Sequence, residues 1–397
     1  MYIKTLTRSL ILQSVLLSHF VFSSYAQQPP KLQESNFFLY KQDNGAYSAR
    51  KQDGSIAFTD PSFSTVFNAT VSSLPQGGDI RLAGNTTFTV DKSLNIPNKW
   101  INVQGGGNST ILKAAAGLNA SVIYASGDWS KGYISLQDFQ IDGNKANNTS
   151  TDEHGIELYR IWNANLRDLF IHDVHGDGIY THAEQGTKGI VEARWTDLTI
   201  YDAYRCAIHL GRNATDFEIE NVIMRTRHGL TAPTTYAVYC EGGGGAGTQF
   251  SNIHSYEFDY GFWIDWGDVA ISNFHSDGNK VGIMLNGSHL VQVTNSWFSQ
   301  NPSGAFIMKN ALQNTITANT ILFKGDTSNA DGINISGKST QNIITGSIIS
   351  GYKGYGINLT DAGVQNTVLN GNIVSGNSEG WLNDHGGQTT QQGNVTH

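Results

Sequence analysis

The stretch 155–182 decides the fold, and it reads GIELYRIWNANLRDLFIHDVHGDGIYTH. It opens on a glycine followed by an apolar residue, and the same pattern begins again at Gly178. A longer segment with strand-like alternation, LRDLFIHD, lies between the two copies. Two short strands therefore fall within one period of about 25 residues, and such a period predicts stacked turns of chain.

The first element of this unit recurs along the chain as Gly or Ala followed by an apolar residue. Successive copies are separated by 21 to 30 residues. The later copies read AIHLG from Ala207, AVYCE from Ala237, GFWID from Gly261, GIMLN from Gly282, AFIMK from Ala305, GINIS from Gly332, GINLT from Gly356 and GWLND from Gly380.

The second element recurs as well, as RWTDLTIYD, EIENVIMRT, FSNIHSYE, ISNFHSDG, VTNSWFSQ and ITANTILF. One residue, usually Asp or Asn, keeps the same place in each copy. These residues are Asp138, Asp168, Asp197, Asn221, Asn252, Asn273, Asn295 and Asn319, followed by Gly346 and Gly371. We expect a coil of parallel strands stacked about 4.8 Å apart, in which these side chains form a buried hydrogen-bonded ladder and do not bind substrate.

Three features together resemble a known family. They are the repeat, the ladder and the segment 74–114, which reads LPQGGDIRLAGNTTFTVDKSLNIPNKWINVQGGGNSTILKA. They resemble the pectate lyase superfamily, in particular its epimerase-like pectate lyase and rhamnogalacturonase-type group. The resemblance covers about residues 60–397 and implies an all-β fold, a single-stranded right-handed parallel β-helix with an N-terminal hairpin and helix cap. The superfamily hosts lyases, hydrolases, epimerases and phage tailspikes, so the resemblance leaves the reaction open.

Three regions are expected along the chain. Residues 1–26 predict a secretory signal peptide, with Lys4 and Arg8 before the apolar run 10–22 and a small-residue cleavage site at 24–26. A single-span anchor is the alternative, but the run is short for a bilayer. Residues 27–76 predict a β-meander and a capping helix, and residues 77–397 predict the parallel β-helix.

The predicted cap follows from turn and helix signals. Asn44-Gly45 and Asp53-Gly54 favour two hairpin turns. The segment SFSTVFNATVSSL places apolar residues at helical spacing, and Pro61 or Ser62 would open the helix. We expect its apolar face to cover the first open end of the coil.

Composition limits the partners. Beyond residue 26 the chain carries 23 basic and 33 acidic residues, which argues against nucleic-acid binding. There are only two cysteines, Cys206 and Cys240, placed too far apart along adjacent coils for a disulfide. Eleven N-x-[ST] sequons fit a secreted glycoprotein. We expect an extracellular monomer with no membrane contact after cleavage and a polysaccharide as partner.

Strand alternation identifies the side chains that face outward together. In each Gly-Ile strand the second and fourth residues after the glycine point out. From the coil of Gly155 to that of Gly261 they are aromatic, imidazole or acidic apart from Gly211, whereas from Gly332 onward they are small amides and hydroxyls. Because rings stack on sugars and polar groups fix hydroxyls, the first set predicts a sugar-binding groove, although an ordinary solvated face is the alternative. The substrate-binding candidates are Glu157, Tyr159, Arg160, Tyr180, Trp263 and Lys309.

The stretch HDVHGDGIYTHAE, 172–184, resembles a metal site in composition. We expect His172, His175 and Asp177 to end a strand and form the next turn, on a different side of the coil from His182. One ion could not collect all three histidines, and the spacing of a zinc site is missing. Only Tyr180 and His182 are assigned to the groove.

Polysaccharide lyase chemistry on a uronic-acid polymer is the leading hypothesis. Elimination needs a base for the C5 proton, a cation for the carboxylate and an acid for the leaving oxygen. His182 or His209 could be the base, Arg212 or Arg160 the cation, and Tyr239 or Tyr180 the acid. No cofactor is required by this scheme, although Glu157, Glu241 or Asp265 could hold Ca²⁺.

Two alternatives stay open from the sequence. Glu241 and Asp265 occupy the same place on adjacent coils and could serve a retaining glycoside hydrolase. The NTD, DD, GHG and RIK motifs of β-helix galacturonases are missing, however. The third hypothesis is a carbohydrate-binding surface protein without catalysis. The polysaccharide, the linkage, the endo or exo mode and the metal requirement cannot be read from the residues.

Overall fold

The computed structural model describes residues 37–129, 132–226, 234–243, 245–325, 329–387 and 389–397. Contacts divide the chain into two units, Met1–Leu32 and Gln33–His397. The first unit, which holds the predicted signal peptide, lies outside the described residues. Within the described part, no helix is both long enough and apolar enough to span a bilayer.

An antiparallel meander and one helix begin the described structure. Strands β1 (Phe37–Lys41), β2 (Tyr47–Lys51) and β3 (Ile56–Asp60) pair in order, so both predicted hairpins are confirmed. Helix α1 (Phe63–Ser72) follows, and the Ser62 hydroxyl accepts a bond from the Thr65 N–H, which makes Ser62 the N-cap. The division between cap and coil at residue 76/77 stays a prediction.

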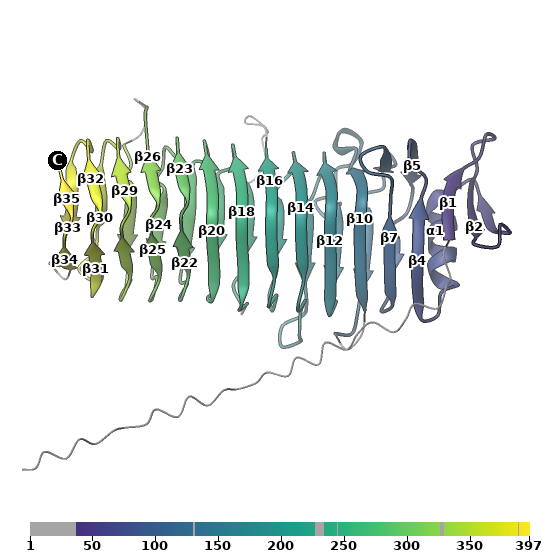
Figure 1. Cartoon of the computed structure of the whole chain (residues 1–397), viewed down its shortest axis with the longest axis horizontal. Helices are drawn as coiled ribbons and strands as arrows, with labels where there is room; N and C mark the ends of the chain where they lie inside the picture. Colours follow the sequence, from purple (N-terminus) through teal and green to yellow (C-terminus); the bar gives the residue numbers. More distant parts are fainter. Residues whose placement is uncertain (1–36, 130–131, 227–233, 244, 326–328, 388) are drawn as a thin grey trace, which may run out of the picture. The chain divides into compact units, whose positions relative to one another are not determined.

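The rest of the described chain forms a coil built from two parallel sheets (Figure 1). The first sheet after the cap contains β4 (Gly77–Leu82), β5 (Thr86–Val90), β7 (Trp100–Gln104), β8 (Thr110–Ala114), β10 (Tyr133–Asp142), β12 (Asn163–His172), β14 (Arg194–Tyr201), β16 (Glu218–Arg225), β18 (Thr248–Tyr256), β20 (Val269–Asp277), β22 (Gln292–Thr294), β23 (Trp297–Ser299), β25 (Thr315–Thr317), β26 (Thr320–Leu322), β28 (Ile343–Thr345), β29 (Ile348–Ser350), β31 (Thr367–Asn370), β32 (Ile373–Ser375), β34 (Thr389–Gln392) and β35 (Val395–Thr396). The second sheet contains β6 (Leu94–Ile96), β9 (Ile123–Ser126), β11 (Ile156–Tyr159), β13 (Ile179–His182), β15 (Cys206–Leu210), β17 (Tyr236–Cys240), β19 (Tyr260–Ile264), β21 (Val281–Asn286), β24 (Phe306–Lys309), β27 (Ile333–Ser336), β30 (Tyr355–Leu359) and β33 (Gly380–Asp384).

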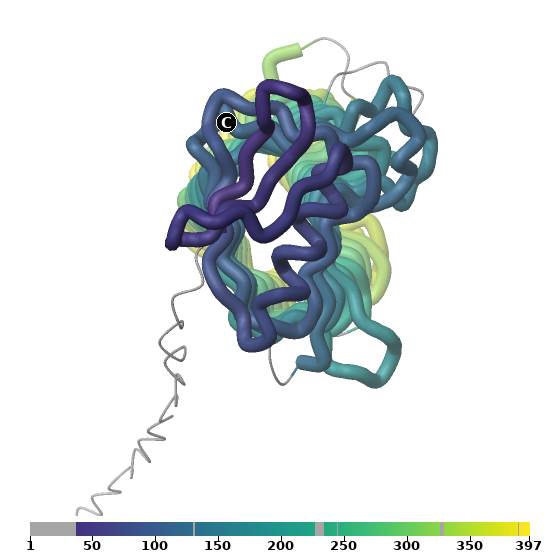
Figure 2. Tube along the Cα trace, turned by 90° about the vertical axis from the view of Figure 1, so that its right-hand side faces the viewer, coloured from purple at the N-terminus to yellow at the C-terminus, as the bar shows by residue number. Residues whose placement is uncertain are grey.

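Each strand pairs in parallel with its counterpart one coil later, as β10 pairs with β12 and β11 with β13. Seen along the coil, successive turns superimpose around one interior (Figure 2). Phenylalanines stack inside it from turn to turn, and Phe250, Phe262, Phe274 and Phe298 are fully buried. Burial of this continuous apolar column is the main force that holds the coils together.

The recurring Asp and Asn residues lie where the first sheet bends. Asp168, Asn221 and Asn252 have φ of +51°, +56° and +54°, a left-handed conformation that Asn, Asp and Gly adopt most readily. The expected ladder is present, because the Asn252 amide donates to Asn221 at 3.1 Å and the Asn273 amide donates to Asn252 at 3.1 Å. These ladder side chains are exposed, so the expectation of a buried ladder is wrong.

Asn319 was assigned to the ladder, and this register is wrong by one residue. Ala318 has the left-handed φ of +55°, and Asn319 is the next residue, facing inward and buried. Its side-chain oxygen accepts a bond from the Ser296 N–H at 2.9 Å, and its own N–H donates to the Ser347 hydroxyl. The later coils therefore contain a second, internal polar ladder, which satisfies backbone groups at the bend.

Cys206 and Cys240 are buried free thiols. Cys206 aligns with Tyr236, and Cys240 aligns with Leu210, so the two cysteines are four positions apart along adjacent strands. The expectation of no disulfide between them is confirmed.

Candidate functional site

Two outward rows of side chains run along the second sheet, as strand alternation predicts. In the first row Glu157 aligns with Tyr180, Tyr180 with His209 and His209 with Tyr239. Trp263 continues this row after Tyr239. In the second row Tyr159 aligns with His182, and further along Asn286 aligns with Lys309. The structure therefore places the candidates on one face, within successive coils.

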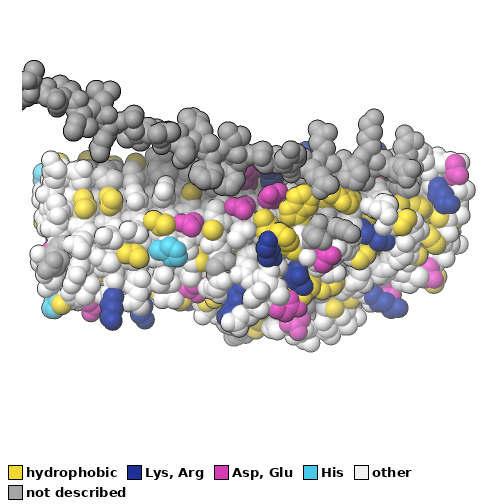
Figure 3. Space-filling model, turned by 90° about the horizontal axis from the view of Figure 1, so that it is seen from below, with side chains coloured by type: hydrophobic (Ala, Val, Ile, Leu, Met, Phe, Trp, Pro, Cys, Tyr) yellow, Lys and Arg dark blue, Asp and Glu magenta, His cyan; other side chains and the backbone are white. Residues whose placement is uncertain are grey.

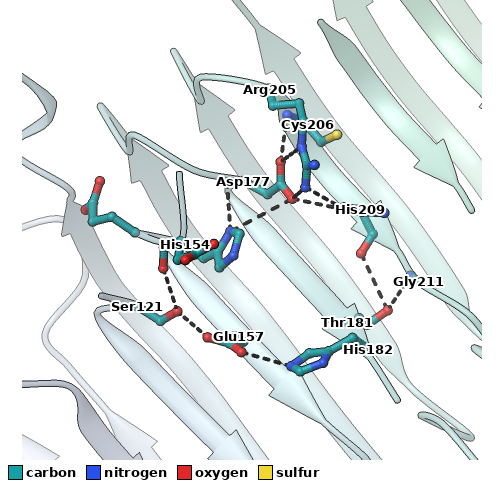
Figure 4. Close-up of polar contacts among 12 residues, drawn as sticks. Ser121, His154, Glu157, Asp177, Thr181, His182, Arg205, Cys206, His209 and Gly211 are labelled. Atoms are coloured by element: carbon teal, nitrogen blue, oxygen red, sulfur yellow. Dashed lines mark hydrogen bonds and ion pairs between the residues drawn. The ribbon is translucent and has the colours of Figure 1, made fainter. Parts of the chain in front are cut away.

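Asp177 lies at the centre of the site, in the turn that precedes β13 (Figure 4). Its carboxylate is completely buried. Oδ1 accepts bonds from Arg205 Nε at 3.0 Å and from the Cys206 N–H at 3.0 Å. Oδ2 accepts from Arg205 Nη2 at 2.5 Å and lies 3.0 Å from His209 Nδ1. A bidentate guanidinium and an imidazole thus hold one buried carboxylate.

These contacts fix the charges of the three groups. Burial alone would raise the pKa of Asp177, but its bonds from His209 and Arg205 prevail and hold that pKa far below the ordinary range. Burial alone would lower the pKa of His209, yet its bond to Asp177 and its close contact with Glu241 raise it. The site therefore favours an imidazolium at His209 beside an ionised Asp177.

The outer edge of His209 meets a second carboxylate. His209 Nε2 is buried without a hydrogen bond of good geometry, and it lies 3.5 Å from Glu241 Oε2. Glu241 Oε1 in turn accepts from Arg212 Nε at 3.3 Å. The close contact with His209 is the main reason that the pKa of Glu241 lies below its usual range. The Arg212 side chain is 45% exposed, so part of it is open to a ligand.

His182 forms a separate pair with Glu157, one coil away from His209. His182 Nε2 lies 2.8 Å from Glu157 Oε1, and Glu157 also accepts a bond from the Ser121 hydroxyl. Burial would raise the pKa of Glu157, but these two bonds lower it, so the carboxylate stays ionised. The His182 side chain is 29% exposed, against 5% for His209, so only His182 offers ring surface to a ligand.

Stacked rings join the two pairs. The Tyr180 ring lies 4.8 Å from His182 with an interplanar angle of 2°, and 4.7 Å from His209. Tyr239 stacks on the other side of His209 at 4.9 Å. Burial is the main cause that raises the pKa of Tyr180 to about 12, and it also raises the pKa of Tyr239. Both phenols therefore keep their protons at neutral pH.

Asp265 is held by its neighbours. It accepts bonds from Trp263 Nε1 at 2.6 Å, from the Asn286 amide at 2.9 Å and from the Tyr239 hydroxyl at 3.3 Å. The carboxylate therefore fixes the orientation of the Trp263 and Tyr239 rings.

The remaining candidates lie at the edges of the site. Tyr159 donates to Glu184, and the Arg160 guanidinium lies 5.9 Å from the Tyr159 ring. Lys309 is exposed on β24, the second strand after that of Trp263, so it lies away from the two histidine pairs. A hollow of about 460 Å³ opens near Glu184, lined among others by Trp129 and Lys188, whose Nζ lies 3.2 Å from the Trp129 ring centroid.

Sequence reasoning missed Asp177, Arg205 and His154. The Asp177 N–H donates to His154 Nδ1 at 2.9 Å, and the His154 ring packs on Tyr180. Asp177 was assigned to turn chemistry together with His172 and His175, and only its burial by the next coil reveals its role. The clustering of seven of the ten arginines between residues 160 and 227 was the one signal that pointed to Arg205.

The separation of the three histidines in 172–184 is confirmed. His172 Nε2 contacts the Gln140 amide at 2.6 Å, and its Nδ1 contacts Asp173 at 2.7 Å. His175 stacks on Tyr204 with ring centroids 4.5 Å apart. Neither side chain takes part in the contacts of His182.

Three groups of side chains among the described residues have donor atoms close enough together for a metal ion. In the first, Asp177, Cys206 and His209, the carboxylate is occupied by Arg205. The other two are Asp142, His172 and Asp173, and His254, His275 and Asp277. None of the predicted Ca²⁺ ligands Glu157, Glu241 and Asp265 belongs to such a group in the described part of the chain.

Figure 3 shows how the character of one face changes along the coil. Toward the C-terminal end, at left, that face is mostly uncharged, whereas charged and hydrophobic side chains gather over the middle. On the second sheet the same change occurs along one row, where Met284 and Ile307 are followed by Asn334 and Asn358. The chemically varied surface is therefore confined to part of the coil.

Comparison with known proteins found similarity mainly at the level of fold. A family profile described as periplasmic copper-binding protein (NosD) matches residues 219–395. The comparison with curated protein sequences found no match.

Among solved structures, the A-module of the mannuronan C-5 epimerase AlgE6 from Azotobacter vinelandii has 16% identity and a TM-score of 0.68, over 84% of this chain and 95% of that chain. Gene product 12 of bacteriophage phi29 has 12% identity and a TM-score of 0.70, over 81% of this chain and 48% of that chain. The catalytic unit of a GH87 α-1,3-glucanase from Streptomyces thermodiastaticus has 11% identity and a TM-score of 0.56, over 84% and 66%. The chain therefore shares the fold of these structures, a parallel β-helix, and the coil of parallel strands that its repeat predicts is confirmed.

Proposed function

We propose that this chain is a secreted carbohydrate-active enzyme that cleaves a uronic-acid polysaccharide by β-elimination. The observation that carries the proposal is the pairing of two unlike imidazoles on one face. His209 is buried between two carboxylates, which raise its pKa, whereas His182 is partly exposed and bound to one carboxylate. Elimination from a uronate needs both a fixed positive charge and a base.

His182 is the proposed base. When its Nε2–H donates to Glu157, the lone pair of Nδ1 is free to take the C5 proton of the sugar. The Glu157 carboxylate then stabilises the imidazolium that forms, as an orienting acid does in other imidazole-based sites. His209 is not the proposed base, because its burial and its contacts with Asp177 and Glu241 leave neither ring nitrogen open to the sugar.

Arg212, which Glu241 anchors beside the buried His209, is proposed to neutralise the sugar carboxylate, with Arg160 at the edge of the same face. As the C5–H bond breaks, a C4–C5 double bond forms and the C4–O bond breaks. The leaving oxygen takes a proton from Tyr180, or alternatively from Tyr239. Both phenols have raised pKa values and therefore have protons to give. The protons are exchanged with water before the next turnover.

The hydrolase alternative is less well supported by the same residues. A glycosidase needs one carboxyl group that stays protonated at working pH. Glu241 has a lowered pKa because of His209, and Asp265 already accepts three hydrogen bonds. An epimerase would share the first step with a lyase and would differ only in returning a proton to the opposite face of C5.

Two of the similar structures are enzymes that act on polysaccharides, a mannuronan epimerase and a glucanase, which agrees with a carbohydrate substrate. The matched family profile names copper. Donors that copper accepts, His254, His275 and Asp277, lie inside the matched range, but on the first sheet. The proposed elimination takes no step through them.

The deciding experiment is a product screen. The purified protein is incubated with uronic-acid polymers and neutral glycans, with and without Ca²⁺, and the products are analysed by mass and ultraviolet absorbance. Unsaturated products, lighter than the hydrolytic ones by one water, would support elimination. Saturated oligosaccharides would favour hydrolysis, and an unbroken polymer with altered C5 configuration by NMR would favour epimerisation. Binding to a uronate polymer without any product would favour the non-catalytic alternative.

A further inference from the structure

Two histidines lie side by side on the outer surface of the first sheet, away from the proposed site. His254 on β18 aligns with His275 on β20, one coil later. Their rings are stacked with centroids 4.5 Å apart and an interplanar angle of 9°. Asp277 is two residues after His275, and because side chains alternate along a strand it lies on the same face.

The donor atoms of these three side chains lie close together. One donor atom from each residue lies within 4.8 Å of the others. His254 Nε2 is buried and has no hydrogen-bond partner, although a buried ring nitrogen normally has one. Asp277 accepts one bond, from the Ser299 hydroxyl to Oδ1 at 2.8 Å, and this bond would orient the carboxylate.

The group formed by Asp142, His172 and Asp173 differs from this one in its hydrogen bonds. Asp142, His172 and Asp173 also bring three donors together, but their atoms are already used. Lys113 pairs with Asp142 at 2.5 Å, and both ring nitrogens of His172 contact other side chains. By contrast, the structure gives neither His254 nor His275 a side-chain hydrogen bond to any described residue, so this group lacks the partners that usually satisfy imidazoles.

We propose that His254, His275 and Asp277 bind one divalent transition-metal ion of the zinc or copper type, with water completing the coordination. Two imidazoles and one carboxylate are donors that such ions prefer, whereas Ca²⁺ and Mg²⁺ prefer sites made entirely of oxygen. Two nitrogens bound to one zinc ion are about 3.4 Å apart, so the stacked rings need only a rotation about their side-chain bonds. The ion would link β18 to β20 and hold two adjacent coils together.

The test uses the full purified chain without a histidine tag, stripped of metal with a chelator. Calorimetric titration with Zn²⁺ and with Cu²⁺ should show one tight site, and Ca²⁺ should not compete for it. His254→Ala and His275→Ala should each weaken Zn²⁺ binding at least tenfold. The matched control His172→Ala, from the group whose donors are occupied, should bind as the parent does.

A spectroscopic measurement on the unaltered chain covers the case in which a variant fails to fold. The electron paramagnetic resonance spectrum of the one-equivalent Cu²⁺ complex should show coupling to two imidazole nitrogens. The melting temperature of the parent should also rise with Zn²⁺, because an ion that binds only the folded state stabilises it. Absence of uptake, unchanged affinity in the folded double variant His254→Ala/His275→Ala, or a copper spectrum without imidazole nitrogens would overturn the proposal.

Discussion

Asp177 Oδ2 and His209 Nδ1 lie 3.0 Å apart, contributed by consecutive coils, and both side chains are buried. Arg205 holds the other side of the carboxylate, and its Nη2 lies only 3.1 Å from the same His209 nitrogen. The carboxylate therefore offsets the repulsion between Arg205 and a protonated His209, which are in direct contact. Stability and function at this site depend on one charge, and that charge can be removed without a change of shape.

Asp177→Asn should lower the free energy of unfolding by roughly 2–4 kcal/mol, because it leaves His209 buried beside an unpaired guanidinium. The estimate is below the value for a fully enclosed pair, since 42% of the Arg205 side chain is exposed. Urea denaturation of both proteins measures the difference. Asp173→Asn, which alters a half-exposed acid paired with His172, should change the free energy of unfolding by less than about 1 kcal/mol. Equal effects of the two substitutions would contradict the central role of Asp177.

The raised pKa of His209 predicts a pH dependence of stability. A group whose pKa is higher in the folded state stabilises that state below its unfolded pKa, which is about 6.5 for histidine. This stabilisation is lost as the pH rises through the folded pKa. The melting temperature of the parent should therefore fall from pH 6 to pH 9 relative to that of His209→Gln. Parallel curves for the two proteins would show that His209 is not held as a cation.

His182→Ala should reduce kcat on the active polymer by about 10² to 10⁴, the usual contribution of a general base. Its melting temperature should change little, because the ring is partly exposed and its loss leaves Glu157 bound to Ser121. Ser336→Ala, a change in the same row of the second sheet but in later coils, is the control and should keep full activity. Full activity in His182→Ala would remove His182 as the base.

Much of the fold could be predicted from the sequence because each coil repeats the same local requirement. The bend in the first sheet needs a left-handed residue, and Asn221, Asn252 and Gly346 all meet that requirement. A single period therefore contains the information for the whole coil. The error at Asn319 arose because the adjacent inward position in the later coils also uses Asn, and sequence alone cannot tell a bend residue from its buried neighbour.

The site could be predicted only in part. Residues on the strands, such as His182, His209 and Tyr239, follow from alternation, which fixes their direction. Asp177 and Arg205 are in turns, where no period fixes the direction of a side chain. Their contact also depends on how far each turn reaches over the next coil, and turn length varies between coils. Strand alternation therefore predicts the outward surface of the second sheet, and only the structure shows that Asp177 and Arg205 contact His209.

Substitutions at Asn252, a ladder residue in the left-handed conformation, can distinguish the cost of backbone strain from the cost of lost hydrogen bonds. Asn252 has a φ of +54°, and its side chain bonds to Asn221 and Asn273. Asn252→Gly removes the two exposed bonds but relieves any strain, so it should cost no more than about 1 kcal/mol. Asn252→Val removes the same bonds and also places a β-branched residue in the left-handed region, which should cost about 1–2 kcal/mol more. Gln249→Val, at an exposed position of the same strand, controls for the change to valine and should stay within about 0.5 kcal/mol of the parent. If urea denaturation gives the same stability for the glycine and valine variants, hydrogen bonding and not backbone conformation selects Asn at the bend.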